Sequence, residues 1–355
     1  MEIFEEIKRR GHEQILFIYD RASGLKAIIA IHNTTLGPAL GGCRMLPYQT
    51  EEAALEDALR LSEGMTYKAA AAGLDFGGGK TVIIGDPMKD KSEALFRALG
   101  RFIETLKGRY LTGEDVGTNE EDFVWARRET RYVVGLPPAY GGSGDTGDNT
   151  ARGVIQAMRA ALMHRYGSPE LQGRRIAVQG LGKVGYHVAR RAIEAGARVI
   201  AADINPHVVG RVASAWGIEA TDPWAVVETP CDIFAPCALG NVITERTVSA
   251  LQCQVVAGSA NNQLADDRLA DDLAARGILY APDFIANAGG LIQVADEIRG
   301  YHAERVHHQI DGIYDVLLEI FRRADASGQS TVAVAVDEAR RRLDTIQAIH
   351  RLYGS

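Results

Sequence analysis

Cysteine, long apolar runs and blocks of like charge are all scarce in this sequence of 355 residues. The four cysteines, Cys43, Cys231, Cys237 and Cys253, lack the paired short spacing of a zinc site or disulfide framework, so we expect buried, reduced thiols and no metal. No run approaches the roughly 18 apolar residues of a membrane span, and the charged N-terminal stretch lacks a secretory signal's apolar core. We therefore expect a cytoplasmic protein without a membrane partner.

The charge balance disfavours a nucleic-acid partner. The sequence has 39 basic and 46 acidic side chains, a net charge of −7, and no block of like charges that would follow a phosphate backbone. Hydrophobic residues make up 46% and charged residues 24%, which is typical of soluble globular proteins. A chain of this length is long enough for about two domains, each with its own core.

The first third of the chain mixes strand-like and helix-like patterns. Residues 25–32 and 81–84 are apolar and β-branched, as buried strands are. Residues 51–65 and 92–106 carry apolar side chains at helical spacing. We therefore expect an N-terminal domain of mixed α/β structure over residues 1–147.

Glycine is dense between residues 135 and 149, which predicts an irregular segment and a hinge between two domains. After it, short apolar strands alternate with amphipathic helices, so we expect βαβ crossovers and a parallel sheet in a second domain, residues 148–330. The expected strands are 176–179, 199–202, 233–234, 255–257 and 278–280. Two later helices, about 304–324 and 332–352, are also expected. The last, about 331–355, can pack back on the first domain.

A dinucleotide-binding turn is predicted at Gly180-Leu181-Gly182-Lys183-Val184-Gly185, between an apolar strand and a helix. The first glycine permits a tight turn, the second lets the backbone approach a pyrophosphate, and the third allows close packing of helix on strand. The next strand ends at Asp203, whose carboxylate can bind ribose hydroxyls and repel a 2′-phosphate, which favours NAD. Two alternatives stay open: a purely structural turn, and NADP binding through Arg175 or Arg198.

Two lysines follow glycines in the first domain, in Gly64-Met-Thr-Tyr-Lys68 and Gly77-Gly-Gly-Lys80. Lys80 precedes an apolar strand, where desolvation would favour the neutral amine and make the lysine a base near neutral pH. The glycines lack the spacing of a phosphate loop. From spacing alone, a catalytic and a surface lysine are equally possible. Asp115 is the acid candidate, although its simpler interpretation is a turn or helix-capping aspartate.

In their order along the chain, these motifs resemble the glutamate/leucine/phenylalanine/valine dehydrogenase family, specifically its leucine, valine and phenylalanine branch. The similar segments are 35–42, 64–68, 77–80, 115–118, 180–185, 235–240, 258–262 and 281–290. The resemblance implies an N-terminal mixed α/β domain that binds substrate and forms the oligomer contacts. It also implies a C-terminal Rossmann domain, with a cleft between the two that closes over substrate and cofactor.

The resemblance also implies roles for single residues. Lys68 would bind the substrate carboxylate with help from the backbone near Gly42, and Asn287 would orient the substrate. Lys80 would be the general base and Asp115 would relay protons. The implied reaction is hydride transfer from the α-carbon to the nicotinamide, which gives an imino acid. A water activated by Lys80 then attacks the imine, and ammonia and a 2-oxo acid are released.

For the cofactor, NAD, the resemblance implies that Thr150 and Asn262 hold the nicotinamide amide and that Ala238 lies beside the adenosine. The full set of expected cofactor-binding residues is Gly180, Leu181, Gly182, Lys183, Val184, Gly185, Asp203, Ile204, Thr150, Ala238 and Asn262.

Four residues are expected, by resemblance, to shape the side-chain pocket: Leu40, Gly113, Leu291 and Val294. All are apolar or lack a side chain, which disfavours a charged substrate such as glutamate. Leucine and valine enzymes of this family usually carry alanine at the position of Gly113 and valine at that of Leu291. Phenylalanine enzymes resemble this chain with glycine and leucine.

We therefore predict NAD-dependent, reversible oxidative deamination of L-phenylalanine to phenylpyruvate and ammonia. The alternatives are a leucine or valine dehydrogenase and, in another class, a non-catalytic NAD-binding regulatory module. The resemblance suggests a homo-oligomer. An octamer is favoured, with a dimer or tetramer also possible.

Overall fold

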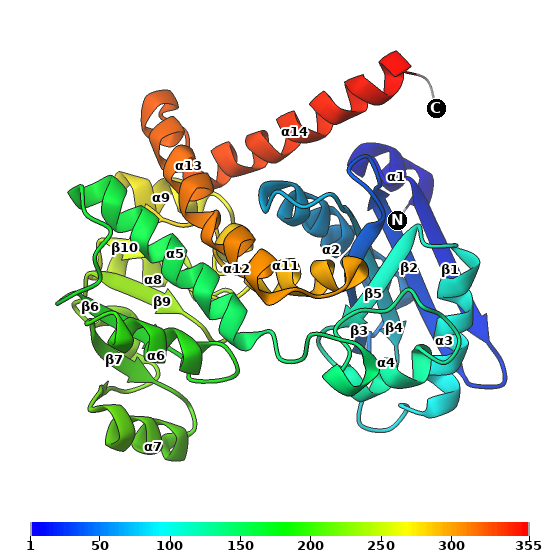
Figure 1. Cartoon of the computed structure of the whole chain (residues 1–355), viewed down its shortest axis with the longest axis horizontal. Coiled ribbons are helices and arrows are strands. Elements are labelled where there is room, and N and C mark those ends of the chain that lie inside the picture. The colour runs from blue at the N-terminus through cyan, green and yellow to red at the C-terminus, as the bar shows by residue number, and fades with distance from the viewer. Residues whose placement is uncertain (1, 354–355) are drawn as a thin grey trace. The chain divides into compact units, whose positions relative to one another are not determined.

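The computed structural model describes residues 2–353, with side chains described up to residue 349. Two compact units divide the chain (Figure 1). Unit 1 comprises Met1–Asp145, Gln293–His302 and Ala339–Ser355, and unit 2 comprises Thr146–Ile292 and Ala303–Glu338. These units differ from the domains expected from the sequence, 1–147 and 148–330, because the segment 293–302 belongs to unit 1 and the segment 331–338 to unit 2.

Unit 1 contains a mixed five-stranded sheet in the order β1-β2-β4-β3-β5. Its strands are β1 (Gln14–Asp20), β2 (Leu25–Asn33), β3 (Ala39–Leu46), β4 (Gly77–Ile84) and β5 (Tyr110–Glu114). Strand β2 is antiparallel to β1 and β4, whereas β3 is parallel to β4 and β5. The predicted mixed α/β structure is therefore confirmed, with the expected strands inside β2 and β4.

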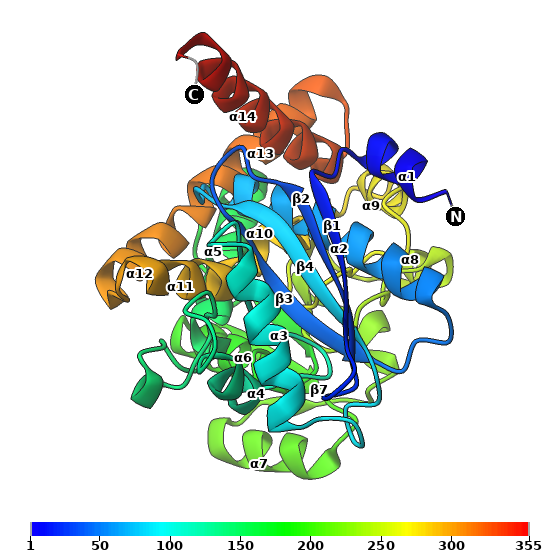
Figure 2. The same cartoon turned by 90° about the vertical axis from the view of Figure 1, so that its right-hand side faces the viewer.

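Two helices cover opposite faces of this sheet (Figure 2). Helix α2 (Glu51–Ala71) starts after Thr50, and α3 (Glu93–Thr105) starts after Ser92. Each of these hydroxyl side chains accepts a backbone hydrogen bond from the first turn of its helix. Because side chains alternate along a strand, Ile28 packs under α2 while its neighbour Ile29 packs under α3. The shorter helices of this unit are α1 (Ile3–Arg10), α4 (Glu120–Ala126) and the 3-10 turns η1 (Pro138–Tyr140) and η3 (Glu297–Arg299).

Unit 2 contains a six-stranded sheet in the order β11-β10-β9-β6-β7-β8, and every neighbouring pair is parallel. The strands are β6 (Arg175–Gln179), β7 (Arg198–Ala202), β8 (Glu219–Ala220), β9 (Ile233–Pro236), β10 (Val255–Val256) and β11 (Leu279–Tyr280). This is the doubly wound order of a Rossmann fold, with the switch point between β6 and β9. The predicted parallel sheet is confirmed.

Helices connect these strands and complete unit 2. They are α5 (Gly147–Tyr166), α6 (Gly185–Glu194), α7 (Pro206–Trp216), η2 (Ala225–Glu228), α8 (Glu245–Ala250), α9 (Leu269–Ala275), α10 (Asp283–Ala286), α12 (Ala303–Asp311) and α13 (Ile313–Ser327). The single helix predicted over about 304–324 is wrong, because α12 and α13 are separate helices that meet at Gly312. Within the described residues, no helix has the length and apolar character to cross a membrane.

Two helices belong to both units: α11 (Gly289–Asp296) and α14 (Thr331–Tyr353). In the second half of α14, Ala339 and Leu343 pack on Ala70 of α2. Arg342 donates to the carbonyl oxygen of Ala70 at 3.0 Å and to that of Leu74 at 2.8 Å. Residues 339–343 of α14 are thereby held against α2 within unit 1.

The glycine-rich stretch 135–149 is less irregular than predicted. It includes the 3-10 turn η1, and α5 begins at Gly147. Within unit 1, the Glu297 carboxylate accepts backbone hydrogen bonds from Gly135 and Ser143, each at 2.8 Å. Gln293 donates to the Ser143 hydroxyl at 3.0 Å. These contacts hold the stretch 135–145, and its role as a hinge stays a prediction.

Candidate active site

A buried ion pair joins Lys80 and Asp115 in unit 1. Lys80 lies in β4, is 4% exposed, and places its Nζ 2.7 Å from Oδ2 of Asp115, which directly follows β5. Strand β3 runs between β4 and β5, so the pair meets over β3 at Gly42. A Cβ at position 42 would lie 2.8 Å from the Asp115 Cβ and 3.4 Å from the Lys80 Nζ. Glycine at 42 therefore leaves room beside both charged groups.

The glycines before Lys80 allow close packing against β4. A Cβ at Gly78 would collide with the backbone of Thr66 in α2, and one at Gly79 would lie 2.7 Å from the Tyr110 ring. Lys68 lies two residues beyond Thr66, half-buried in the last turn of α2, just as Lys80 lies two residues beyond Gly78. The glycine contact therefore brings the helix that carries Lys68 against the strand that carries Lys80.

Asp115 is held by a loop that is fastened to β3. Its backbone N–H donates to the Thr118 hydroxyl oxygen at 3.0 Å, and that hydroxyl donates to the Cys43 carbonyl at 2.8 Å. The backbone N–H of Met45 donates to the Val116 carbonyl at 2.9 Å. The next helix, α4, is capped by Asn119. Asp115 is therefore not the N-cap residue of that helix, and its carboxylate faces cations.

Arg44 is a second cation beside Asp115, and it was not among the residues predicted from the sequence. Its Nε donates to Asp115 Oδ2 at 3.0 Å. Burial raises the pKa of Asp115, but the positive charges of Lys80 and Arg44 outweigh burial and leave this pKa below its ordinary value. Asp115 is therefore a carboxylate near neutral pH. Arg44 escaped prediction because its strand, β3, contains Gly41 and Gly42 and does not show a strand pattern.

In unit 2, the predicted glycine turn joins β6 to α6. Gly180 has φ +91°, a conformation that favours glycine. A Cβ at Gly185 would collide with the Gly180 carbonyl, whereas a Cβ at Gly182 would meet no atom within 4 Å. No side chain caps the start of α6 at Val184. The turn therefore has an open glycine at the start of a helix, where a pyrophosphate would bind.

Asp203 is fixed beside this turn. Its Oδ2 accepts a hydrogen bond from the backbone N–H of Leu181 at 2.7 Å, and its Oδ1 accepts one from Asn205 at 2.8 Å. Ala238 lies against the turn, since a Cβ on Gly180 would be 2.8 Å from its Cβ, and Ile204 is 82% exposed. Carboxylate oxygens have further lone pairs for ribose hydroxyls. These residues fit a bound dinucleotide.

The remaining polar candidates of unit 2 come from α5 and from two loops. Thr150 is 8% exposed and donates to the Thr146 carbonyl at 2.9 Å. Asn262 has φ +52°, and its carbonyl accepts from the backbone N–H of Asn241 at 2.6 Å. Asn287, at the C-terminal end of α10, donates to Asn261 Oδ1 at 2.8 Å, which connects this helix end to the loop after β10. Their contacts with ligands stay predictions.

The expected specificity residues are divided between the units: Leu291 belongs to unit 2 and the other three to unit 1. Leu40 is 1% exposed in β3, whereas Leu291 and Val294 are partly buried. A Cβ at Gly113 would lie 2.8 Å from the Val134 carbonyl oxygen and 3.4 Å from its Cγ2. A methyl group at 113 would therefore press on Val134, and the role of Gly113 in the side-chain pocket stays a prediction.

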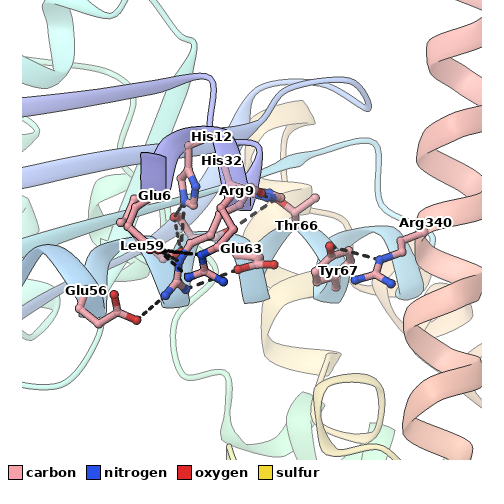
Figure 3. Close-up of polar contacts among 12 residues, drawn as sticks. Glu6, Arg9, His12, His32, Glu56, Leu59, Glu63, Thr66, Tyr67 and Arg340 are labelled. Atoms are coloured by element: carbon pink, nitrogen blue, oxygen red, sulfur yellow. Dashed lines mark hydrogen bonds and ion pairs between the residues drawn. The ribbon is translucent and has the colours of Figure 1, made fainter. Parts of the chain in front are cut away.

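A second polar cluster of unit 1, absent from our predictions, surrounds two buried histidines (Figure 3). A ring nitrogen of His12 lies 2.9 Å from the Ser62 hydroxyl, and His32 Nδ1 lies 2.8 Å from the Thr66 hydroxyl. Burial, followed by the proximity of His32, lowers the pKa of His12 to about 4. Both histidines contact α2 at residues that precede Lys68 in the sequence. They therefore help to hold in place the helix that carries Lys68. No group of three or more potential metal-ligating side chains occurs among the described residues.

The doubly wound parallel sheet, with its glycine turn and fixed acidic residue, defines a dinucleotide-binding α/β protein. A family model for the "Glu/Leu/Phe/Val dehydrogenase, dimerisation domain" matches residues 12–132, and one for "Glutamate/Leucine/Phenylalanine/Valine dehydrogenase" matches residues 141–209 and 208–335. The chain belongs to this family and is an amino-acid dehydrogenase. The predicted family and enzyme class are confirmed.

Individual relatives agree on the class but differ in substrate. The chain is 52% identical over 347 residues to leucine dehydrogenase of Geobacillus stearothermophilus, covering 98% of this chain and 95% of that one. It is 49% identical over 353 residues to phenylalanine dehydrogenase of Thermoactinomyces intermedius, covering 99% and 96%. The crystal structure of L-tryptophan dehydrogenase from Nostoc punctiforme matches with a TM-score of 0.87 and 43% identity, covering 97% of this chain and 99% of that chain.

Proposed function

We propose that the protein catalyses the NAD-dependent, reversible oxidative deamination of L-phenylalanine to phenylpyruvate and ammonia. The observation that carries this proposal is the Lys80–Asp115 pair, a buried amine 2.7 Å from a carboxylate in an amino-acid dehydrogenase. A lysine and a carboxylate at hydrogen-bond distance can exchange a proton directly, as general acid–base catalysis requires.

The side chains of unit 1 would perform the proton chemistry. We assign binding of the substrate carboxylate to Lys68 and to the backbone at Gly42. Lys80 removes a proton from the water that adds to the imino acid, and Asp115 accepts or returns that proton across the 2.7 Å contact. When bound, NAD supplies the acceptor for the hydride of the substrate α-carbon.

The choice of NAD over NADP depends on Asp203 in unit 2. Two backbone hydrogen bonds fix its carboxylate beside the glycine turn. A fixed negative charge at this position favours ribose hydroxyls and repels a 2′-phosphate. Thr150 and Asn262 are the proposed partners of the nicotinamide amide, and Asn287 is the proposed partner of the substrate.

The choice of phenylalanine depends on single positions, because leucine and phenylalanine dehydrogenases are almost equally similar to the chain. Gly113 and Leu291 support phenylalanine through their likeness to enzymes of that branch. Gly113 also lets Val134 pack directly against β5. Leucine or valine is the second candidate, supported by the 52% identity to a leucine dehydrogenase.

A panel of L-amino acids, each assayed with NAD and with NADP, tests these choices. We expect the highest kcat/KM for phenylalanine with NAD. Gly113→Ala should lower the ratio of kcat/KM for phenylalanine to that for leucine by about tenfold, because the methyl group would press on Val134 and shift the wall of the proposed pocket, where a change of about one methyl group matters on that scale. A higher kcat/KM for leucine or valine in the unmodified protein would overturn the substrate proposal, and preference for NADP would overturn the cofactor proposal.

We also propose a homo-oligomer, with an octamer ahead of a dimer or tetramer. The description of the first family model as a dimerisation domain supports this proposal. So do Phe17 and Tyr19, which are 56% and 64% exposed on the edge strand β1. Light scattering of the purified protein measures the mass, and a monomer would refute the proposal. The cytoplasmic location stays a prediction.

A further inference from the structure

A row of alternating charges continues from the Lys80–Asp115 pair across β3 to helix α2. Asp115 Oδ2 accepts from Lys80 Nζ at 2.7 Å and from Arg44 Nε at 3.0 Å. The other side of the Arg44 guanidinium donates through Nη1 to Asp57 Oδ2 at 3.0 Å. Arg44 therefore bridges two carboxylates, one at the proposed site and one on the helix that covers the sheet.

The far end of this row is anchored by α2 and by the segment before it. Asp57 Oδ2 accepts from the Tyr48 hydroxyl at 2.6 Å, and Asp57 Oδ1 accepts from Arg60 at 2.7 Å. The side chains of Arg44 and Asp57 are only 18% and 14% exposed, whereas that of Arg60 is 49% exposed. The guanidinium of Arg44 is thus fixed on both sides in a largely buried position.

This arrangement addresses a difficulty in the proposed chemistry. A lysine that acts as a base must be a neutral amine during part of the reaction. If Lys80 were the only partner of Asp115, loss of its charge would leave a mostly buried carboxylate unpaired, and such a group tends to take up a proton. Arg44 keeps its charge at any pH at which the protein folds, so Asp115 remains paired in both states of Lys80.

We propose that Arg44, anchored by Asp57, is a positioning residue that holds Asp115 directed at Lys80 and favours its return to the ionised form after each proton transfer. This inference depends on the proposed role of Lys80 as the base. Neither Arg44 nor Asp57 was among the residues expected from the sequence or from the family resemblance.

The proposal predicts shifts of opposite sign in the pH dependence. Loss of the Arg44 charge would make the Lys80–Asp115 pair hold its proton to higher pH. Loss of the Asp57 charge would leave the Arg44 charge less compensated, so the pair would lose its proton at lower pH. The charged and titratable groups around the pair and the neighbouring Cys43 thiol are Arg44 and Cys43 on β3, Asp57 and Arg60 on α2, Tyr48 before α2, Lys91 before α3 and Asp122 on α4.

The experiment compares the pH profiles of kcat/KM for Arg44→Gln and Asp57→Asn in the full-length enzyme, with the preferred amino acid and saturating cofactor. In Arg44→Gln, we expect the acid limb to move up by about one pH unit, and kcat to fall roughly 100-fold at neutral pH. In Asp57→Asn, the limb should move down, with a smaller loss of kcat. Arg44→Lys should return the limb to its original position and recover part of kcat, because it restores the charge.

Arg10→Gln is the matched control. Arg10 is also a largely buried arginine, 12% exposed, and it pairs with Glu56 and Glu63 of α2 in the histidine cluster (Figure 3). Its replacement removes partly exposed ion pairs to the same helix at a different place. We therefore expect lower thermal stability in this variant and an unchanged acid limb.

The inference would be overturned if the acid limb of the pH profile stays in place in both Arg44→Gln and Asp57→Asn. It would also be overturned if the limb moves in the same direction in both variants. If Arg44→Gln does not fold, Asp57→Asn decides alone, since a limb that stays in place or rises contradicts the proposal. Near-normal turnover in Lys80→Ala would instead refute the proposed role of Lys80 as the general base, on which the inference depends. Unchanged limbs in an enzyme that needs Lys80 would reject only the role of Arg44.

Discussion

The candidate cofactor site of unit 2 consists mainly of backbone groups, whereas the candidate proton-transfer site of unit 1 consists of side chains from separate strands. The glycine turn of unit 2 lies in one stretch of sequence, and Asp203 is held there by two backbone N–H groups. In unit 1, Lys80, Asp115 and Arg44 come from β4, from the loop after β5 and from β3. The difference fits the cofactor-binding role proposed for unit 2, for which shape matters, and the proton-transfer role proposed for unit 1, for which charge matters.

The largest expected effect is the loss of kcat when Lys80 is replaced. It would distinguish the Lys80–Asp115 pair from an ordinary ion pair of unit 1. Lys80→Ala should lower kcat by about 100- to 10,000-fold, because it removes the proposed general base. NAD should still bind, since its proposed site lies in unit 2. Steady-state kinetics and a calorimetric titration with NAD measure both quantities.

Lys91→Ala is the control for that variant. Lys91 also forms a lysine–aspartate pair in unit 1, with 2.5 Å between its Nζ and Oδ2 of the buried Asp122. Its loss should reduce stability and leave kcat near the original value. An equal loss of kcat in both variants would show that the Lys80 pair is structural.

Substitutions at two glycines of unit 2 should distinguish an effect on stability from an effect on cofactor binding. Gly185→Ala places a methyl group against the Gly180 carbonyl, which is backbone and cannot move aside, so we expect a loss of about 3 kcal/mol in the free energy of unfolding. Gly182→Ala meets no atom within 4 Å and should fold with stability within about 0.5 kcal/mol of the original. It should still raise the KM for NAD, because the methyl group lies where the pyrophosphate would approach. Equal stability of the two variants would contradict this account.

Replacement of Asp203 tests the cofactor choice. Asp203→Asn removes the negative charge and weakens the hydrogen bonds proposed for ribose, so the KM for NAD should rise roughly 10- to 100-fold. The ratio of kcat/KM for NAD to that for NADP should fall, because the repulsion of a 2′-phosphate is lost. If neither value changes, Asp203 has only a structural role at the turn.

The smallest effect concerns His12, which contacts α2. Its folded-state pKa of about 4 lies below the ordinary value of 6.5, so between these values the unfolded chain binds the proton and the folded protein does not. The free energy of unfolding should therefore fall as the pH drops from 6.5 to 4, by about 2 kcal/mol after allowance for solvent screening. His12→Gln should flatten this slope in urea unfolding at several pH values. An unchanged slope would exclude His12 as its source.

The difference between contiguous residues in unit 2 and residues from separate strands in unit 1 explains which parts of the candidate sites could be predicted from the sequence. The dinucleotide turn follows from spacing, because its glycines and the strand and helix around it are contiguous. The roles of Lys80 and Asp115 required the family resemblance, because their pairing depends on the order of β4, β3 and β5 in the sheet. Strands β3 and β5 contain Gly41, Gly42 and Gly113 and show no strand pattern, so the position of Arg44 between two carboxylates could not be anticipated.

The prediction of helices and strands from the sequence had a similar limit. The central strands of unit 2 were predictable because each is short, apolar and followed by a helix. The break between α12 and α13 at Gly312 was missed, because apolar side chains continue at helical spacing on both sides of it. The packing of Val134 against Gly113 was also not predicted, because the sequence does not reveal which segment lies beside β5.

The most direct test of the central claim is a crystal structure with NAD and a substrate or 2-oxo acid bound. We predict that Lys68 Nζ will contact the ligand carboxylate. We also predict that Lys80 Nζ will lie within about 3 Å of the reacting group, or within one water of it, while still paired with Asp115. A structure in which both ε-amino groups lie far from the α-carbon, with the cofactor in place, would contradict the account.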